Sequence, residues 1–340
     1  MSTIKLGING LGRIGRTVIR EFEKRKQEGM FSDLEIVAVN NPGNIDEYAH
    51  LLKFDSLHGK FPGEVKAEGT TLTCGSSSLH YFSHMDPSEI DWNSQNVDIV
   101  IDATGVFKDK AGLGKHLGGS VKKVIMCAPG KDLDGTFVFG INHETYNSAD
   151  HHIVSNASCT TNCLAPIAKV LNDSFGIEQG FMTTVHAYTG DQNILDARHS
   201  DMRRSRAAAM SMIPTSTGAA KAVGLVLPEL KGKLDGYAVR VPTPDVSMVD
   251  LTVTLKKEVT VEAINSAMKE ASQTTLKGVL GYEELPLVSV DFMGNPNSSV
   301  FDSLLTNVIG NQAKVVSWYD NEVGFSNRVV DLAHFIGSKL

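Results

Sequence analysis

The stretch with the clearest chemical capacity is one cysteine among small polar residues, at positions 155–162 (SNASCTTN). The apolar segment that follows predicts a helix with Ser158 near its N-cap and Cys159 at its mouth. Unpaired backbone N–H groups and the positive end of the helix dipole favour a thiolate there, which is the nucleophilic form of cysteine. The same N–H groups can hold an oxyanion or a phosphate. A buried, inert cysteine beside an ordinary cap fits this stretch equally well.

His186 is the second candidate for chemistry. It lies near the end of residues 180–188, whose alternating apolar residues predict a strand. Together, Cys159 and His186 would form a thiolate–imidazolium couple, although a lone histidine is usually structural. Polar residues downstream have the chemistry to hold two oxyanions: Thr189, Asp191, Arg203, Arg204, Thr217, Gly218 and Arg240. A solvated or intersubunit charge cluster is the alternative for these arginines, and we favour it for Arg206.

The elements that must position these residues begin with a βαβ unit. Residues 4–9 predict a buried strand, 13–26 a helix and 34–40 a second strand, with GxGxxG between the first two. The glycines permit a tight turn and let the backbone approach a pyrophosphate at the helix N-terminus. A glycine-rich turn in another α/β fold is the alternative, but the strand on each side favours dinucleotide binding.

Two further buried strands, at 97–102 and 124–127, are predicted to run parallel to the first. Ligands of doubly wound sheets collect at the carboxyl ends of their strands, so residues that follow these strands are expected in the cofactor site. Cys127 is expected to be a wall residue there rather than a second nucleophile. The candidate cofactor-binding residues of this half are Asn9, Gly10, Gly12, Arg13, Ile14, Gly15, Asn41, Thr104, Gly105 and Cys127.

After the Cys159 helix the pattern changes to mostly antiparallel strands with helices on one face, which is typical of an α+β domain. The predicted strands are 180–188, 237–241, 249–255, 287–290 and 314–319, and the predicted helices are 219–227 and 261–271. We therefore predict an α/β Rossmann-type dinucleotide-binding domain over 1–158 and an α+β catalytic domain over 159–320. Residues 321–340 predict an amphipathic helix that joins the first domain.

Length and composition bound the function. The chain has 340 residues, 41% hydrophobic and 21% charged, which suits two globular domains. A net charge of −7 argues against general binding to nucleic acid or acidic membranes, so an anionic substrate needs a local basic pocket. No apolar run has the length of a membrane span. The four cysteines form neither a CxxC pair nor a disulfide framework, so we expect a reducing cytoplasm and no metal site.

Six motifs extend the pattern along the chain: GINGLGRIGR (7–16), SNASCTTN (155–162), HAYTGDQ (186–192), TSTGAA (215–220), YAVRVP (237–242) and WYDNEVG (318–324). With them the chain closely resembles the phosphorylating glyceraldehyde-3-phosphate dehydrogenase family over almost its whole length. The resemblance implies an oxidoreductase that converts glyceraldehyde-3-phosphate to 1,3-bisphosphoglycerate with NAD or NADP and inorganic phosphate. It also implies a homotetramer.

The resemblance implies a mechanism in which Cys159 attacks the aldehyde carbon to form a thiohemiacetal. His186 is expected to lower the pKa of the thiol, to take the hydroxyl proton during hydride transfer and to stabilise the oxyanion states. Hydride passes to the nicotinamide and leaves a thioester on Cys159. Inorganic phosphate then attacks the thioester to give an acyl phosphate. Cys163 matches the family's second cysteine, which is not the nucleophile.

The resemblance further implies separate sites for two phosphate groups. The substrate's phosphate is expected at Thr189, Asp191 and Arg240, and the attacking phosphate at Ser158, Thr160, Arg204, Thr217 and Gly218. Asn321 matches the residue that fixes the nicotinamide carboxamide. Residues 188–214 resemble the loop that reaches toward a neighbouring subunit's cofactor.

Three positions depart from the family's usual NAD pattern. Asn41 stands where the family usually has Asp, and an amide bonds to a ribose hydroxyl but does not repel a 2′-phosphate. Arg198, after Ala197, stands where many NAD-specific relatives have Leu-Pro, and Phe325 stands where Tyr is frequent. A lost carboxylate and a gained cation favour a 2′-phosphate, so we expect NADP to be used at least comparably with NAD. An Arg198 that points to bulk solvent would weaken this expectation.

Three other functions fit parts of the chain. An erythrose-4-phosphate dehydrogenase shares the cysteine and histidine but hydrolyses its thioester. The residues that favour phosphate as the acceptor here are Ser158, Thr160, Arg204 and the run Thr215, Ser216, Thr217 and Gly218. A Cys–His hydrolase is disfavoured by the GxGxxG unit. A binding or adhesion role is disfavoured as the primary function by the intact Cys159 and His186.

Overall fold

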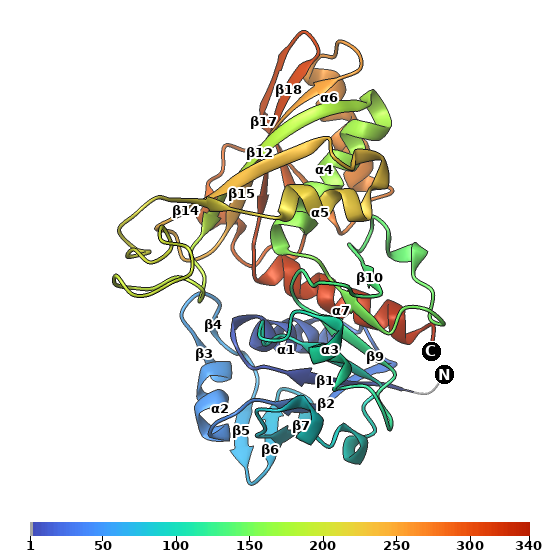
Figure 1. The fold of residues 1–340 in the computed structure, drawn as a ribbon, viewed down its shortest axis with the longest axis vertical. Coiled ribbons are helices and arrows are strands. Elements are labelled where there is room, and N and C mark those ends of the chain that lie inside the picture. Colours follow the sequence, from blue (N-terminus) through green and yellow to red (C-terminus); the bar gives the residue numbers. More distant parts are fainter. Residues whose placement is uncertain (1–2) are drawn as a thin grey trace. The chain divides into compact units, whose positions relative to one another are not determined.

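The computed structural model describes residues 3–340, and the chain divides into two compact units. The first unit contains the described residues up to Phe137, together with His143–Ala157 and Ser326–Leu340. The second unit contains Val138–Asn142 and Ser158–Phe325. Figure 1 follows the chain through its helices and strands.

The first unit is built on a mostly parallel sheet. Within residues 3–340 its strands lie in the order β10-β11-β9-β8-β1-β2-β7-β6-β5, parallel from β10 to β7 and antiparallel from β7 to β5. The strands are β1 (Ile4–Asn9), β2 (Leu34–Asn40), β5 (Val65–Glu68), β6 (Thr71–Cys74), β7 (Ser77–Phe82), β8 (Ile99–Asp102), β9 (Lys123–Met126), β10 (Gly135–Thr136) and β11 (Ile153–Ser155). The remaining elements are α1 (Arg13–Gln27), α2 (Ile45–Lys53), α3 (Lys110–Gly114) and the short pair β3 (Phe54–Asp55) and β4 (Gly59–Lys60).

The carboxyl ends of the central strands of this sheet carry polar residues. Every residue of β8 and β9 is buried, as expected for parallel strands that are covered on both faces. Asn9 at the end of β1 is level with Asn40 on β2 and with Asp102 on β8. Three polar side chains therefore gather at the sheet edge where this class of fold binds its ligands.

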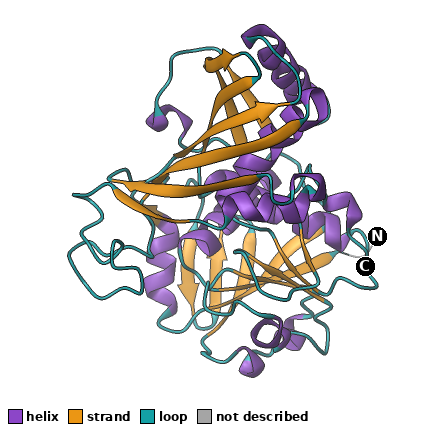
Figure 2. Cartoon of the chain, turned by 45° about the horizontal axis from the view of Figure 1, so that its top comes forward, coloured by secondary structure: helices purple, strands orange, loops and turns teal. Residues whose placement is uncertain are grey.

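The second unit is built on a mixed sheet. Its strands lie in the order β13-β14-β12-β15-β18-β17-β16 within the described chain, and only the β12–β14 and β16–β17 pairs are parallel. The strands are β12 (Ile177–Ala187), β13 (Ile213–Ser216), β14 (Leu234–Val241), β15 (Ser247–Leu255), β16 (Leu280–Glu283), β17 (Ser299–Ile309) and β18 (Gln312–Tyr319). Helix α4 (Cys159–Phe175) packs on this sheet and against both α5 (Ala219–Val226) and α6 (Val261–Gln273). Figure 2 distinguishes these helices from the strands. The predicted fold class is confirmed for both units.

One predicted element of the second unit is wrong. Residues 287–290 do not form a strand, because a 3₁₀-helix spans Ser289–Phe292. The Asp291 carboxylate accepts the backbone N–H of Val288 at 2.8 Å, and such local side-chain bonds compete with strand pairing. Strands β13, β16 and β17 are absent from the prediction, and β17 carries a register shift between Asp302 and Asn307 that breaks its alternation.

Helix α7 (Val323–Gly337) begins in the second unit and has most of its length in the first. On α1, Arg25 Nη2 lies 2.6 Å from Asp331 Oδ1, and Glu21 Oε2 accepts a hydrogen bond from Asn327 Nδ2 at 3.0 Å. Paired in this way, these buried polar groups hold the C-terminal helix against α1. Over residues 3–340, no helix has both the length and the apolar character needed to cross a bilayer.

Candidate active site

Cys159 is the first residue of helix α4, and Ser158 is its N-cap. The Ser158 hydroxyl oxygen accepts the N–H of Thr161 at 3.0 Å and lies 2.7 Å from the Thr161 hydroxyl. No acidic side chain occupies the first turn of α4, so no negative charge opposes the helix dipole at Cys159. The predicted cap and the predicted start of this helix are confirmed.

His186 lies near the end of β12, with its buried ring directed at the cysteine. Its Nε2 is 3.5 Å from Cys159 Sγ, and its Nδ1 is 2.7 Å from the carbonyl oxygen of Ala187. The short second contact favours a proton on Nδ1 over the longer 3.2 Å approach of Arg240 Nη1 to the same nitrogen, because two acceptors would repel each other at 2.7 Å. Nε2 is then an acceptor that faces the thiol.

Burial opposes the expected thiolate–imidazolium couple in the chain by itself. Burial raises the pKa of the Cys159 thiol, and this outweighs the lowering by the Arg240 cation and by hydrogen bonds from Thr160. Burial, followed by the Arg240 cation, lowers the pKa of His186 to about 3. Burial therefore disfavours the charged form of each group, and the charged couple stays a prediction. The cap and dipole of α4 are local features that the sequence predicts. The loss of solvation at Cys159 and His186 depends on the residues packed around them.

Tyr319, at the end of β18, connects the first turn of α4 with β12. Its hydroxyl lies 2.8 Å from the hydroxyls of both Thr160 and Thr184. Its ring packs edge-on against His186, with centroids 5.9 Å apart and planes at 82°. The side chain is 1% exposed, so its contacts hold the first turn of α4 and the His186 ring in place.

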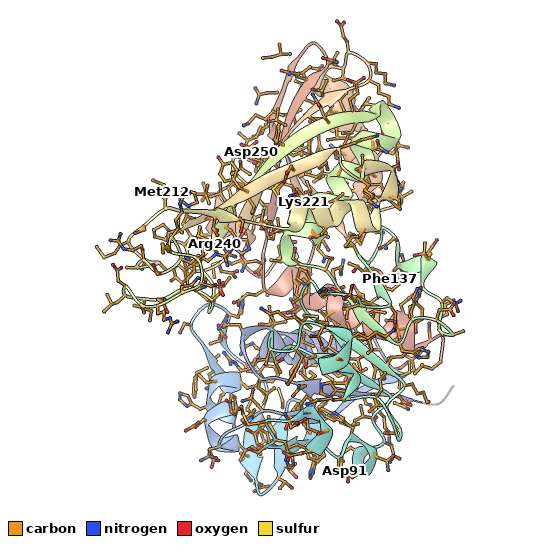
Figure 3. All side chains as sticks on the ribbon, viewed as in Figure 1. Asp91, Phe137, Met212, Lys221, Arg240 and Asp250 are labelled. Carbon is orange, nitrogen blue, oxygen red and sulfur yellow. The ribbon has the colours of Figure 1, made fainter. Side chains whose placement is uncertain are left out.

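Arg240 supplies the nearest positive charge. The parallel register of β12 and β14 pairs it directly with His186, and Figure 3 labels it among the side chains of β14. Its Nη1 donates to the Ala187 carbonyl at 3.1 Å and to the Thr189 hydroxyl at 3.4 Å. Its Nε is buried without an acceptor among residues 3–340. A buried donor left without a partner suits a site that binds an anion.

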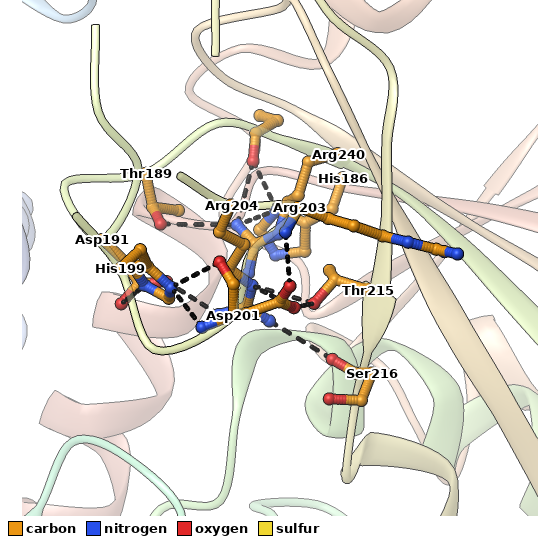
Figure 4. A network of polar contacts seen from close by, with 11 residues as sticks. His186, Thr189, Asp191, His199, Asp201, Arg203, Arg204, Thr215, Ser216 and Arg240 are labelled. Carbon is orange, nitrogen blue, oxygen red and sulfur yellow. Dashed lines mark hydrogen bonds and ion pairs between the residues drawn. The ribbon is translucent and has the colours of Figure 1, made fainter. Parts of the chain in front are cut away.

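Arg204 is the second cation of the cluster, and Figure 4 shows its contacts. Its Nη1 donates to Asp191 Oδ2 at 2.7 Å, its Nε to the Thr215 hydroxyl at 2.9 Å and its Nη2 to the Ser216 carbonyl at 3.2 Å. Asp191 is thus ion-paired with Arg204, although sequence reasoning grouped it with Thr189 and Arg240. This carboxylate lies within the positive cluster.

The remaining predicted phosphate-binding residues lie at two helix starts. The Thr160 hydroxyl is engaged by Tyr319, as the Ser158 hydroxyl is by Thr161. Gly218 is the N-cap of α5 without a side-chain cap, and the Thr217 hydroxyl accepts the N–H of Ala219 at 3.2 Å. Thr217 directly follows Ser216, whose carbonyl binds Arg204, so the chain itself brings α5's first turn near this cation.

In the first unit, the polar residues at the sheet edge form a closed network. Asn9 Nδ2 donates to Asp102 Oδ2 at 2.9 Å, and Asn9 Oδ1 accepts from Asn40 Nδ2 at 2.8 Å. His116 Nδ1 accepts the indole N–H of Trp92 at 3.1 Å, and its Nε2 lies 3.3 Å from Asp102 Oδ2. The side chain of Asn9 is engaged on both sides, and its carbonyl oxygen accepts the N–H of Ala103 at 2.8 Å, so Asn9 is bonded within the sheet edge.

The glycine-rich turn has the shape that a dinucleotide needs. Gly10 has φ +98°, and a Cβ on Gly15 would lie 1.9 Å from the Gly10 carbonyl oxygen, so neither position accepts a side chain. A Cβ on Gly12 would meet no atom within 4 Å, and Gly12 caps α1 without a side-chain hydrogen bond. The open space and the positive end of the helix dipole at this helix start fit a pyrophosphate.

The other predicted cofactor residues of the first unit surround this turn. The Asn41 Oδ1 accepts the N–H of Leu11 at 2.8 Å, so its amide braces the glycine-rich turn. Arg13 in the first turn of α1, beside the half-buried Ile14, has its Nη1 2.6 Å from Asp55 Oδ2.

Beyond β8 and β9, the Thr104 hydroxyl donates to Asp102 Oδ1 at 2.7 Å, and Gly105 has φ +66°. The backbone N–H of Cys127 donates to the Asp102 carbonyl oxygen at 2.9 Å, and burial raises the pKa of its thiol. A raised pKa disfavours the thiolate, so Cys127 is a poor nucleophile at pH 7.

Comparison with known proteins identifies the family. Residues 4–110 match the model of the glyceraldehyde 3-phosphate dehydrogenase NAD binding domain, and residues 158–321 match that of the C-terminal domain. The chain is 56% identical over 337 residues to a glyceraldehyde-3-phosphate dehydrogenase of Priestia megaterium, covering 99% of each chain. It is 55% identical over 337 residues to glyceraldehyde-3-phosphate dehydrogenase 1 of Bacillus subtilis, again over 99% of each.

The chain belongs to the glyceraldehyde-3-phosphate dehydrogenase family. It is therefore an NAD-dependent oxidoreductase, as the resemblance in sequence implied. A third relative, glyceraldehyde-3-phosphate dehydrogenase 2 of Trichormus variabilis, is 52% identical over 338 residues and is covered to 99% on each side.

Two predicted cofactor residues of this dehydrogenase lie in the second unit. Asn321 follows β18 and is 5% exposed, and its Oδ1 accepts the Ser247 hydroxyl at 2.8 Å. Arg198 is exposed in the single chain. Its exposure weakens the argument for NADP that rests on this cation.

Sequence reasoning assigned no role to several residues that touch the active-site side chains of this dehydrogenase. Tyr319 lies inside one of the six motifs, so its motif membership was an available signal. His199, whose Nε2 lies 3.5 Å from Asp191 Oδ1, belongs to an irregular loop and carried no such signal. Ser247 carried none either.

Proposed function

We propose that this dehydrogenase oxidises glyceraldehyde-3-phosphate and transfers the acyl group to inorganic phosphate. The observation that carries the proposal is the 3.5 Å contact between Cys159 Sγ and His186 Nε2 beside a pair of arginines. In this proposal residues 1–158, with the glycine-rich turn, form the dinucleotide-binding domain, and the C-terminal helix over 321–340 joins it. Residues 159–320 form the catalytic domain.

In the first step the Cys159 sulfur bonds to the aldehyde carbon, and its proton passes to the acceptor nitrogen of His186. His186 passes this proton to the carbonyl oxygen, which becomes the hydroxyl of a thiohemiacetal, and the ring is then free to accept a proton again. His186 accepts through Nε2, the ring nitrogen that lies 3.5 Å from the Cys159 sulfur. Arg240 and Thr189 hold the substrate's phosphate, with Asp191 in the same cluster.

In the second step His186 takes the hydroxyl proton as the C–H hydride leaves, and a thioester remains on Cys159. Bound NAD supplies the hydride acceptor, with Asn321 holding its carboxamide. Inorganic phosphate, bound by Arg204 with Ser158, Thr160, Thr217 and Gly218, then attacks the thioester carbon. The Cys159 sulfur leaves and takes up the proton held by His186, while the proton of the phosphate is released to solvent. The products are the acyl phosphate and the free enzyme.

Initial rates with and without phosphate test this proposal. We expect NADH formation from glyceraldehyde-3-phosphate to require inorganic phosphate beyond the first turnover. Steady turnover without phosphate would instead support thioester hydrolysis, as in an erythrose-4-phosphate dehydrogenase. We do not favour that alternative, because relatives 52–56% identical to the chain carry the glyceraldehyde-3-phosphate dehydrogenase name.

NADP use alongside NAD is the finer part of the proposal. Asn41 offers no carboxylate to repel a 2′-phosphate. Because Arg198 is exposed, the support for NADP binding rests on Asn41. The substitution Asn41→Asp is expected to reduce kcat/KM for NADP at least about tenfold and to leave that for NAD within about threefold. A wild-type enzyme with a large preference for NAD would contradict the proposal.

A homotetramer in a reducing cytoplasm completes the proposal. Residues 188–214 expose large apolar side chains in the single chain, which a neighbouring copy would cover. These side chains are Ile194, Leu195, Met202, Met210 and Met212. Light scattering of the purified enzyme tests the tetramer, and Met202→Asp with Met210→Asp is expected to dissociate it.

A further inference from the structure

Ser247 connects the catalytic histidine segment with Asn321. It is the first residue of β15 and is 1% exposed. Its hydroxyl oxygen accepts the backbone N–H of Ala187 at 3.0 Å, and the hydroxyl donates to Asn321 Oδ1 at 2.8 Å. The carbonyl of the same Ala187 accepts the Nδ1 proton of His186. One serine therefore ties together the two peptides that carry His186 and Asn321.

The position of Ser247 follows from the ends of three strands. The ladder between β12 and β15 runs to the pair Val185 and Met248, and Ala187 lies beyond it. On its other side, Ser247 pairs with Tyr319 at the end of β18, two residues before Asn321. The Ser247 side chain makes hydrogen bonds where the backbone ladder ends. These bonds fix the end of β12 relative to the residues that follow β18.

The residue before Ser247 has an unusual backbone. Val246 has φ +62° and is buried, and a β-branched residue rarely adopts this left-handed conformation. Backbone of this kind persists only where the surrounding structure imposes it, and it is frequent at ligand-binding sites. The turn that positions the Ser247 hydroxyl therefore has a backbone conformation that valine disfavours.

The proton of Ser247 decides which end of the Asn321 amide faces a ligand. The Ala187 N–H occupies a lone pair of the hydroxyl oxygen, so the hydroxyl proton is free to be donated to Asn321 Oδ1. The Asn321 Nδ2 then points away from Ser247, and it has no acceptor among residues 3–340. Two N–H groups are thus presented for an external acceptor.

We propose that Ser247 is a positioning residue for the nicotinamide carboxamide. By holding Asn321 Oδ1, it turns the Nδ2 donors toward the carboxamide oxygen, and by holding Ala187 it keeps this amide in register with His186. The inference rests on the proposed function, in which Asn321 binds the carboxamide. It adds the residue that selects the orientation of that amide.

The test compares NAD with ADP-ribose, which has the same adenosine, pyrophosphate and ribose but lacks the nicotinamide. Dissociation constants are measured by calorimetry on the full-length enzyme without substrate. Ser247→Ala is expected to weaken NAD binding about tenfold and to change ADP-ribose binding less than about twofold. Ser247→Thr keeps a hydroxyl and is expected to restore NAD binding to within about threefold.

A matched control is Ser317→Ala. Ser317 is also fully buried, and its hydroxyl lies 2.7 Å from that of Ser299, but it contacts neither Ala187 nor Asn321 by hydrogen bond. Its loss is expected to destabilise the fold without changing the NAD to ADP-ribose affinity ratio. If Ser247→Ala does not fold, Ser247→Cys replaces it, because a thiol is a much weaker donor of similar shape.

A double-mutant cycle adds a second measurement. If Ser247 acts through Asn321, then Ser247→Ala is expected to weaken NAD binding less than about twofold in an Asn321→Ala background. Equal weakening of NAD and ADP-ribose, unchanged NAD binding, or additive effects in the cycle would each overturn the inference. Wild-type enzyme that binds ADP-ribose but shows no phosphate-dependent oxidation would instead refute the proposed function, and the inference with it.

Discussion

His116 in the first unit and His186 in the second are both almost inaccessible, with exposed fractions of 3% and 4%. His116 accepts an indole N–H on one nitrogen and faces the Asp102 carboxylate with the other. His186 faces a carbonyl oxygen with one nitrogen and a thiol with the other, and a guanidinium group lies 3.2 Å from its ring. Burial is the same for both rings, but their partners differ.

The difference lies in the balance of donors and acceptors around each ring. In the first unit Trp92, Asn9 and Thr104 all donate into a network that contains a carboxylate, so each contact has its complement. In the second unit the Arg240 cation lies against the His186 imidazole, and its charge acts on the Cys159 thiol. The cluster around Arg240 has an excess of positive charge and of donors, which suits the binding of an anion. The network around His116 has its donors and acceptors matched, so its role is to hold strands together.

The largest expected effect comes from removing the nucleophile of the open cluster. Cys159→Ala is expected to reduce phosphate-dependent NADH formation about 10⁴-fold or more, because no other thiol lies against His186. Cys163→Ala is the matched control: burial raises the pKa of the Cys163 thiol to about 12, so it contributes no thiolate. The control is expected to keep its rate within about threefold, with a loss of about 1 kcal/mol in unfolding free energy. Equal losses of rate in both variants would contradict the assignment.

Replacing each of the two histidines in turn tests this comparison. His186→Asn is expected to slow the reaction about 10²- to 10⁴-fold, because the thiol loses its proton acceptor. His116→Asn is expected to leave kcat within about threefold and to lower the free energy of unfolding by about 1–3 kcal/mol, because its buried network loses partners. Both are measured by steady-state rates and urea denaturation. A His116 variant with a large kcat defect and normal stability would reverse the roles.

The depressed pKa of His186 predicts a pH dependence of stability. The folded pKa is about 3 and the ordinary value is 6.5, so between these pH values the unfolded chain binds the extra proton. Stability from this group is complete above pH 6.5 and falls as the pH is lowered, by up to about 1.4 kcal/mol per pH unit. His186→Asn lacks the effect, so any stability advantage of wild type over this variant is expected to shrink from pH 7 to pH 5. A constant difference in urea unfolding would contradict it.

The smallest expected effect concerns the stability that the His116 network of the first unit provides. Trp92→Phe removes the donor to His116 Nδ1 and is expected to lower the unfolding free energy by about 1 kcal/mol, with NADH formation unchanged. Trp318→Phe is the matched control in the second unit, where the indole N–H donates to Asp302 Oδ2 at 3.0 Å. Its cost is expected to be about 1.5–3 kcal/mol, because the partner is a carboxylate. Calorimetry of both variants checks the order.

Much of the fold could be predicted because its signals are local. The strand over residues 4–9, the glycine turn and the helix capped by Ser158 each depend on neighbours a few residues away. The strand expected at 287–290 failed because the Asp291 side chain closes a turn there, which alternation of apolar residues does not report. Strand β17 escaped prediction because its register shift interrupts that alternation.

The sequence by itself determined the identity of the chemistry: a cysteine at a helix start, a glycine-rich turn after a strand, and enough motifs to indicate the family. Only the tertiary structure decided the solvation and the alignment of the site. Cys159 and His186 are separated by 27 residues, and Thr160 and Tyr319 by 159, so their contacts exist only in the folded chain. Desolvation acts on a group through everything packed around it, which is why the dipole of α4 was readable in advance and the raised pKa of Cys159 was not.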